Sequence, residues 1–209
     1  MRSDAELLEA WARGERDAAT ALVDRYYAAV FRFFDLRVGA AAEDLTQRTF
    51  LSCVEARDKL RRAESFRPFL FAIARGLMFN HIRTRTVESN VFETGDVSSA
   101  LDPGPTASRI VARFEEQTLL LRAIQALDVD TQALLVLYYW EGLKTAEIAE
   151  VLGMVPSTVT TRLARARKAL QDAIVVMPAV AAHRDSLLRD LDAWIASVSQ
   201  LDVAVPRQR

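Results

Sequence analysis

The sequence predicts an all-α protein with two small helical domains, a flexible linker between them and one further helix near the C-terminus. Only 7 Gly and 6 Pro occur among 209 residues, too few for the many turns of a β sandwich. Apolar residues recur at helical spacing through most of the chain. Residues 88–108 are instead rich in Ser, Thr, Gly, Pro and acidic residues, and no helix can cross Asp102-Pro103-Gly104-Pro105. The expected domains are residues 1–87 and 109–175, with the acidic linker at 88–108 and a C-terminal extension at 176–209.

Three helical segments are expected in the first domain. The first covers residues 4–35 and breaks near Gly14, and the second begins after Gly39. The third runs from Ser65 to Arg85 and is dense in apolar side chains. In the second segment, helical spacing places on one side Leu45, Thr49 and Val54, with Phe50 and Cys53 beside them.

A helix-turn-helix is predicted in the second domain, where helical periodicity returns at about Arg109 and breaks once at Asp128. Within residues 142–170, Thr145 is placed to cap a short helix, Gly153 supplies the permissive backbone for its end, and Pro156 stands at the start of the next helix. The second of these helices buries Val159, Leu163, Ala166 and Leu170 at helical spacing.

The outer face of that second helix carries hydrogen-bond donors without a carboxylate, as a DNA-recognition helix requires. Arginine can read guanine with two hydrogen bonds, and threonine can meet a phosphate or a thymine methyl group. An ordinary helical hairpin with a basic exterior is the alternative interpretation. The expected DNA-binding residues are Thr158, Thr161, Arg162, Arg165, Arg167 and Lys168.

Charge and chemistry exclude several classes of protein. The net charge is −1, yet residues 57–87 hold eight basic and two acidic side chains and residues 153–171 hold four basic and none acidic. Because salt screens charge beyond ~10 Å, such local islands decide whether a surface holds DNA. One cysteine and two histidines give no disulfide and no metal cluster, and no nucleophile–base pair or phosphate loop stands out. We therefore expect no enzyme, cofactor or metal, and, with no apolar membrane span or signal peptide, a cytoplasmic location.

The chain over about residues 5–172 resembles the bacterial RNA polymerase sigma factors of the extracytoplasmic-function class, which have two helical domains called two and four. The motifs that carry the resemblance in domain four are Glu141-Gly142-Leu143, Glu147-Ile148-Ala149, Leu152-Gly153 and Thr158-Val159. The resemblance implies that this domain reads the promoter's minus-thirty-five element and that the partners are promoter DNA and core RNA polymerase, through its β′ clamp helices and β flap. Whether an anti-sigma factor binds is left open.

Domain two carries the more specific part of the resemblance. The segment 42–50 is similar to the family's polymerase-docking segment, which assigns that role to Glu43, Asp44, Leu45, Gln47 and Phe50. The segment from Ser65 to Arg85 is similar to the element that reads and melts the minus-ten region. Holding an unpaired base takes a basic track and flat side chains or amides. The residues expected there are Arg61, Arg62, Phe66, Arg67, Arg75, Asn80, Arg83 and Arg85.

The sequence departs from the family pattern in three places. Gly76 and Asn80 replace the usual Asn and Asp, and Leu127-Asp128 replaces a usual Leu-Pro. The third departure is a predicted extra helix at about 182–201, whose apolar stripe is Leu187, Leu191, Trp194, Ile195 and Val198. An exposed stripe of this kind is unusual for a soluble monomer, so we expect it to dock within the molecule.

These observations indicate an alternative sigma factor that binds core polymerase and directs promoter-specific initiation. A stand-alone helix-turn-helix regulator is the main alternative. An interaction protein that only binds a regulator is the second.

Overall fold

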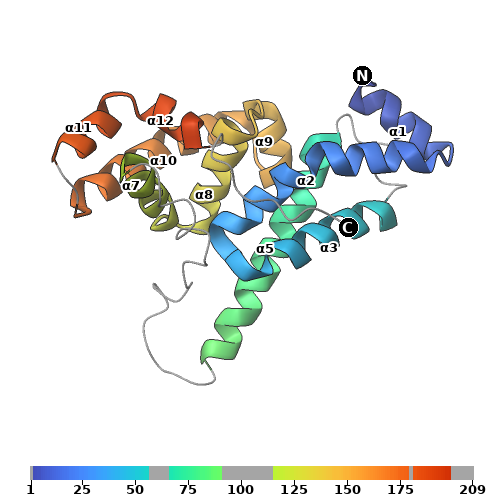
Figure 1. Cartoon of the computed structure of the whole chain (residues 1–209), viewed down its shortest axis with the longest axis horizontal. Helices are drawn as coiled ribbons and strands as arrows, with labels where there is room; N and C mark the ends of the chain where they lie inside the picture. The colour runs from blue at the N-terminus through green and yellow to red at the C-terminus, as the bar shows by residue number, and fades with distance from the viewer. Residues whose placement is uncertain (1, 57–65, 91–114, 179–180, 199–209) are drawn as a thin grey trace. The chain divides into compact units, whose positions relative to one another are not determined.

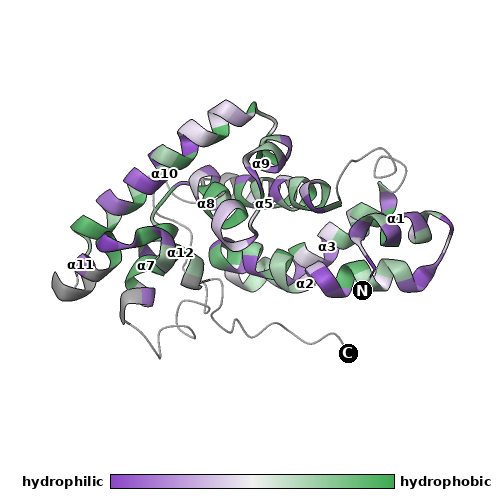
Figure 2. Ribbon diagram, turned by 90° about the horizontal axis from the view of Figure 1, so that it is seen from above, coloured by the Kyte–Doolittle hydropathy of each residue, from purple (hydrophilic) through white to green (hydrophobic). Residues whose placement is uncertain are grey.

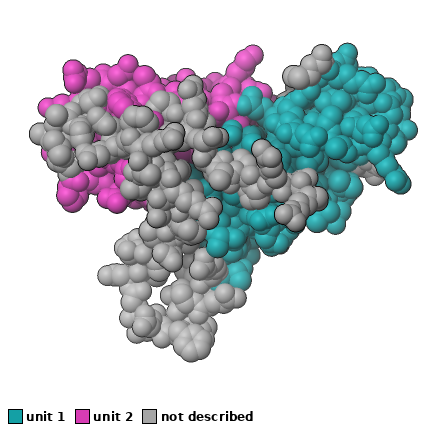
Figure 3. All heavy atoms as spheres, in the orientation of Figure 1, with its two compact units in different colours: residues 1–102, 205–209 teal, residues 103–204 magenta. Residues whose placement is uncertain are grey.

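The computed structural model describes residues 2–56, 66–90, 115–178 and 181–198, without the side chains of 85–90, 115–116, 181–183, 186 and 197–198, and every statement below refers to this part of the chain (Figure 1). Contacts within the chain define two compact units, residues 1–102 with 205–209 and residues 103–204 (Figure 3). The boundary falls inside the segment expected to be the linker, most of which lies outside the described residues. Each unit is therefore described by itself.

Unit 1 consists of helices packed around an aromatic core. Its elements are α1 (Asp4–Ala12), α2 (Arg16–Val38), the 3-10 turn η1 (Gly39–Ala41), α3 (Ala42–Glu55) and α5 (Phe66–Asn90). Helix α2 packs against α1, α3 and α5, and α3 also packs against α5. Phe34 and Phe71 are fully buried between these helices, which removes their large apolar surface from water. The predicted break lies where Gly14 adopts a positive φ of 95°, a conformation that favours glycine.

Helix α3 buries most of the face that the sequence pattern predicted, with one exception. Leu45, Thr49 and Cys53 are buried as expected, but Val54 is 55% exposed. The hydroxyl groups of Thr46 and Thr49 are buried as well, and each donates to the carbonyl oxygen four residues earlier at 2.7 Å. These bonds satisfy the hydroxyl groups within the helix, so threonine can stand at a core position.

Unit 2 contains α7 (Glu115–Gln125), α8 (Val129–Leu135), a π-helical turn η2 (Val136–Trp140), α9 (Thr145–Leu152) and α10 (Pro156–Val176). Asp128 caps α8, because its carboxylate accepts hydrogen bonds from the backbone N–H of Thr131 at 2.9 Å and from the Thr131 hydroxyl at 2.6 Å. Buried Gln132 donates to the carbonyl oxygens of Gln125 and Leu127 and so ties α8 to the end of α7. Helix α10 shows green and purple bands in Figure 2, as expected of a helix with one buried and one exposed face.

The extension folds as two short helices, α11 (Ala181–Arg189) and α12 (Leu191–Val198), where the sequence predicted a single one. Asp190 separates them, and its carboxylate accepts a hydrogen bond from the backbone N–H of Ala193 as an N-cap does. Leu187 and Ile195 are fully buried because α11 packs against α7 and α10, and α12 against α7 and η2. The prediction that the extension docks within the molecule is confirmed. Among the described helices, none is both long enough and apolar enough to cross a membrane.

Candidate nucleic-acid and partner interfaces

Helices α9 and α10 form the predicted helix-turn-helix. The turn between them begins at Gly153, which is left-handed with φ 65° and ψ 41°. The N–H of Met154 donates to the carbonyl of Ala149 at 2.9 Å, which closes α9 in a Schellman motif. Pro156 then begins α10, as predicted.

The start of α9 differs from the prediction by one residue. Lys144 is the N-cap, and Thr145 is already helical. The carboxylate of Glu147 accepts a hydrogen bond from the Lys144 backbone N–H at 2.7 Å. A side chain inside the helix therefore pairs with a backbone N–H at the helix start, where we expected Thr145 to be the cap.

Five of the six expected minus-thirty-five residues share one face of α10. Each residue turns the helix by about 100°, so Arg162 and Arg165 lie on one flank of the buried stripe, while Arg167 is about 200° from Arg165. Arg162 and Arg165 are exposed, and Thr158 is half-buried. The shared face consists of Thr158, Thr161, Arg162, Arg165 and Lys168, and we call it the basic face of α10.

Arg167 lies on the other flank and is bound to the extension. Its Nε donates to the hydroxyl group of Tyr139, its guanidinium lies 3.2 Å from the carboxylate of Asp192, and the Tyr139 hydroxyl in turn donates to Asp192. The guanidinium also stacks over the Tyr139 ring at 5.5 Å. We call Arg167, Tyr139 and Asp192 the C-terminal clamp. The expectation that Arg167 faces DNA with Arg165 is corrected by this geometry.

A hollow of about 310 Å³ adjoins the basic face. Arg162 and Arg165 line it from α10, and Asp128 and Asp130 line it from the start of α8. The sequence pattern of α10 contains no carboxylate on this face, so it could not reveal these two acidic neighbours. The arginines are thus held in a mixed electrostatic environment instead of a purely basic one.

The exposed face of α3 combines acidic, amide and apolar groups. Glu43, Asp44 and Gln47 are exposed as predicted, and Arg48 lies 3.6 Å from Asp44. Leu45 and Phe50 are buried, at 1% and 9% exposure, because they face α2 and α5 in the core; their expected place on the docking surface is corrected. The apolar part of this face consists instead of Leu51 and Val54, which are 62% and 55% exposed.

Helix α5 carries the described part of the expected minus-ten residues. Arg75 stacks over the ring of Phe79 at 4.7 Å, and Asn80 and Arg83 are exposed. Phe66 is only 2% exposed, so its ring belongs to the core and cannot stack on a base as expected. Arg67, the second residue of α5, is half-buried. The other expected residues, Arg61, Arg62 and the side chain of Arg85, lie outside the described residues.

Cys53 is a structural residue in the core of unit 1. It is 2% exposed, and burial raises the pKa of its thiol to about 12, so the thiolate needed for reactivity is suppressed. Among the described residues, no group of three or more His, Cys, Asp and Glu side chains could hold a metal ion.

Comparisons with known proteins agree with this arrangement. The family profile described as "Sigma-70 region 2" matches residues 19–87, and "Sigma-70, region 4" matches residues 117–170. Over 79% of its own length, this chain is 32% identical to the ECF RNA polymerase sigma factor BldN of Streptomyces coelicolor. Over 83% of its own length, it is 30% identical to the RNA polymerase sigma-H factor of Pseudomonas aeruginosa. It spans 95% of sigma-H but 63% of BldN, and as little as 34% of another curated sigma factor that it matches.

A solved structure shares the fold. It is the sigma factor RpoE of Bartonella quintana in complex with the anti-sigma factor NepR, and it superposes with a TM-score of 0.61 at 22% identity. The match covers 76% of this chain and 98% of RpoE. The two matched sigma-70 regions, together with relatives that are 30–32% identical over 76–83% of the chain, identify this protein as a member of the extracytoplasmic-function class of RNA polymerase sigma factors.

Proposed function

We propose that this protein is a dissociable, non-catalytic subunit that binds core RNA polymerase and directs it to specific promoters. The observation that carries the proposal is the presence of both units in one chain. A stand-alone helix-turn-helix regulator needs only a unit such as unit 2, whereas unit 1 adds the exposed mixed face of α3 and the arginines of α5. Phosphodiester chemistry then belongs to the polymerase, and the site of action is the cytoplasm.

The basic face of α10 is the proposed reader of the minus-thirty-five element. A recognition helix fits the major groove, where Arg162 and Arg165 can each reach base edges and Lys168 can contact phosphate. Lys168 also lies 3.3 Å from Asp172, an exposed pair that DNA can displace at little cost. Arg167 is left out of this surface because the C-terminal clamp holds it on the other flank of the helix.

The polymerase-docking surface is the exposed face of α3. Glu43, Asp44 and Gln47 suit a partner helix with basic side chains, and Leu51 and Val54 offer the apolar area that an interface of this kind buries. Arg67, Arg75, Asn80 and Arg83 of α5, together with Arg61, Arg62 and Arg85, form the proposed minus-ten surface. An anti-sigma factor is a further candidate partner, since the RpoE structure contains one.

Run-off transcription with core polymerase and a genomic promoter library tests the proposal. We expect defined start sites that appear only when the protein is added. Arg165→Ala should reduce transcription by about 5- to 150-fold and relax the preference at one promoter position, as the loss of about 1 to 3 kcal/mol of base reading requires. The matched control is Arg122→Ala, an exposed arginine of α7 in the same unit, which should leave transcription unchanged. Sequence-specific DNA binding without any polymerase-dependent transcript would favour the stand-alone regulator.

Core binding is tested separately. The double charge reversal of Glu43 and Asp44 to arginine should weaken the affinity for core polymerase while the fold persists, because substitutions on an exposed surface usually change stability by within about 0.5 kcal/mol. Glu9→Arg, at an exposed position of α1, is the control. Unchanged core affinity in the folded double variant would remove α3 from the interface.

A further inference from the structure

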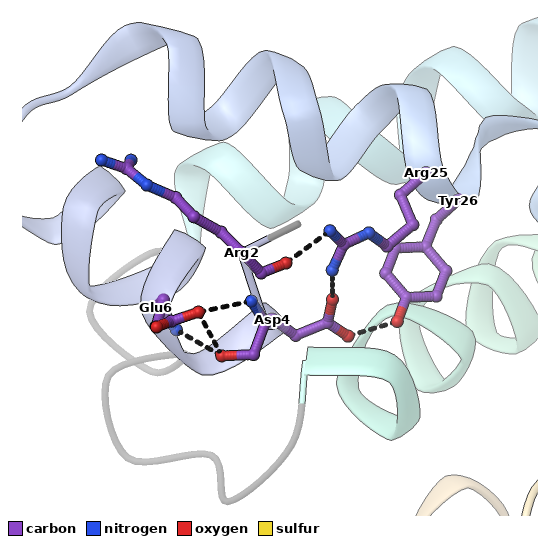
Figure 4. Close-up of polar contacts among 6 residues, drawn as sticks. Arg2, Asp4, Glu6, Arg25 and Tyr26 are labelled. Carbon is purple, nitrogen blue, oxygen red and sulfur yellow. Dashed lines mark hydrogen bonds and ion pairs between the residues drawn. The ribbon is translucent and has the colours of Figure 1, made fainter.

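The first turn of α1 holds α2 through the partly buried carboxylate of Asp4 (Figure 4). The carboxylate of Asp4 accepts hydrogen bonds from Arg25 Nη1 and from the hydroxyl group of Tyr26. Arg25 Nη2 also donates to the backbone carbonyl of Arg2 at 2.7 Å. The side chains of Arg25 and Asp4 are only 23% and 27% exposed, so water screens this ion pair weakly. We call Asp4, Arg25 and Tyr26 the N-terminal clamp.

The backbone around Asp4 is itself fixed. Ser3 and Glu6 form a capping box, in which the Ser3 hydroxyl accepts from the Glu6 N–H at 3.3 Å and the Glu6 carboxylate accepts from the Ser3 N–H at 2.6 Å. These hydrogen bonds from Ser3 lower the pKa of Glu6, so the box persists wherever Glu6 is ionised. Asp4 is therefore presented to α2 from an ordered helix end.

The clamp reaches the beginning of α5 through the ring of Tyr26. That ring lies 5.5 Å from the ring of Phe66, the first residue of α5, at an interplanar angle of 60°. Phe66 is 2% exposed, and the charge of the next residue, Arg67, acts on the Tyr26 hydroxyl. Helix α1 also contacts α5 directly. The first residue of α5 thus packs against the ring of Tyr26, whose hydroxyl group is hydrogen-bonded to Asp4 of α1.

We propose that Asp4 is a positioning residue for promoter opening: by holding Tyr26 it fixes Phe66 and therefore Arg67, at the beginning of the proposed minus-ten surface. The inference rests on the proposed function. Asp4 lies in the clamp and has no role in contacting DNA. Its effect comes from rigidity, because a binding group acts well only when its own supports are locked by packing and hydrogen bonds.

Two substitutions separate the parts of the clamp. Tyr26→Phe keeps the ring against Phe66 but removes the hydroxyl, and Asp4→Asn keeps the size of the side chain but removes its charge. Glu9→Gln is the matched control, an exposed acid on the same helix α1. Each full-length variant is assembled with core polymerase and compared on two templates, one fully duplex promoter and the same promoter with a preformed bubble at the minus-ten region.

We expect Asp4→Asn and Tyr26→Phe to slow open-complex formation on the duplex promoter by about tenfold, as the loss of one charge-assisted hydrogen bond permits. On the bubble template both should match the wild type, and the affinity for core polymerase should not change. The inference is overturned if Asp4→Asn forms open complexes on the duplex promoter as fast as the wild type does. It is also overturned if Asp4→Asn is slowed equally on both templates. If Asp4→Asn fails to fold, Tyr26→Phe decides by the same two outcomes.

The same templates separate this inference from the proposed function. A wild-type chain that supports no promoter-dependent transcript on either template overturns the proposed function. A wild-type chain that works, beside clamp variants that work equally well, overturns only the role of Asp4.

Discussion

Helices α1 and α12 are attached to the rest of their units by the same three types of side chain. In the N-terminal clamp, Arg25 and Tyr26 are adjacent on α2, and both donate to Asp4. In the C-terminal clamp, Arg167 and Tyr139 come from different elements, and the hydrogen bonds run in series from arginine to tyrosine to Asp192. In both cases the aspartate stands in the first turn of a terminal helix, where the helix dipole favours a negative charge.

The two clamps differ in burial, and this decides what each one contributes. The side chains of Arg167 and Asp192 are 35% and 59% exposed. Asp192 is thus more than twice as exposed as Asp4, its counterpart in the N-terminal clamp. The extension compensates with apolar area, since Leu187, Leu191 and Ile195 are all buried. We therefore expect the same polar groups to stabilise the attachment of α1 more than that of α12, because burial sets how strongly water competes with an ion pair.

The largest expected effect breaks the apolar attachment of the extension. Ile195→Ala removes a fully buried side chain of α12 and should lower the free energy of unfolding of unit 2 by about 2 to 4 kcal/mol, from lost burial and the cavity left behind. Chemical denaturation combined with amide exchange over residues 115–198 measures it. Val176→Ala, at an 80% exposed position, is the control and should cost less than about 0.5 kcal/mol. A loss below about 1 kcal/mol for Ile195→Ala would show that apolar burial does not hold the extension.

The next effect concerns the N-terminal clamp. Asp4→Ala leaves Arg25 and Tyr26 without their shared acceptor and should destabilise unit 1 by about 1.5 to 3 kcal/mol, the range for hydrogen bonds to charged groups. Thermal or urea unfolding of the full chain measures it, with Glu9→Ala as the control on the same helix. Equal stability of the two variants would contradict the view that burial strengthens this clamp.

A smaller effect is expected from the C-terminal clamp. Asp192→Ala should cost at most about 1 kcal/mol, because the carboxylate is largely exposed and surface ion pairs contribute little. Asp185→Ala, at an exposed position of α11, is the comparison. If Asp192→Ala costs as much as Asp4→Ala, the contrast drawn between the two clamps is wrong.

The smallest effect appears only at alkaline pH. Burial, and then the hydrogen bond to Asp192, raises the pKa of Tyr139 to about 12. A tyrosine with a raised pKa in the folded state stabilises that state fully below its ordinary value of about 10, and the contribution is lost as the pH rises toward 12. We expect amide protection of α12 to fall over this window. The pKa of Tyr26 is raised as well, first by burial and then by the hydrogen bond to Asp4, so the N-terminal clamp should likewise persist above the ordinary tyrosine pKa of about 10. Absorbance titration of Tyr26→Phe and Tyr139→Phe chains assigns each tyrosine; an ordinary pKa at Tyr139 would remove the effect.

Helical periodicity and helix-end residues were sufficient to predict the fold class, the helix-turn-helix and the docking of the extension, because these depend on local spacing and on one buried stripe per helix. They failed where two apolar faces compete. On α3, the pattern grouped Val54 with Leu45 and Thr49 and the resemblance assigned Phe50 to the docking surface, whereas packing against α2 and α5 buries Phe50 and leaves Val54 exposed. The position of Arg167 could have been found from its angle on α10 relative to Arg165. The clamps could not, because their partners are 21 to 53 residues apart in the chain.

The hollow beside the basic face of α10 affects how strongly the free protein binds DNA. Asp128 and Asp130 lower the positive potential at Arg162 and Arg165, so part of the attraction to phosphate is cancelled before DNA arrives. Under the proposed function, free copies of the protein then spend little time on the many non-cognate sequences of a chromosome. If the polymerase tethers unit 2 beside a promoter, as proposed, the local concentration of DNA rises to a level at which weak intrinsic binding suffices. Under the same proposal, the two aspartates would favour promoter binding by the assembled holoenzyme over DNA binding by the free protein.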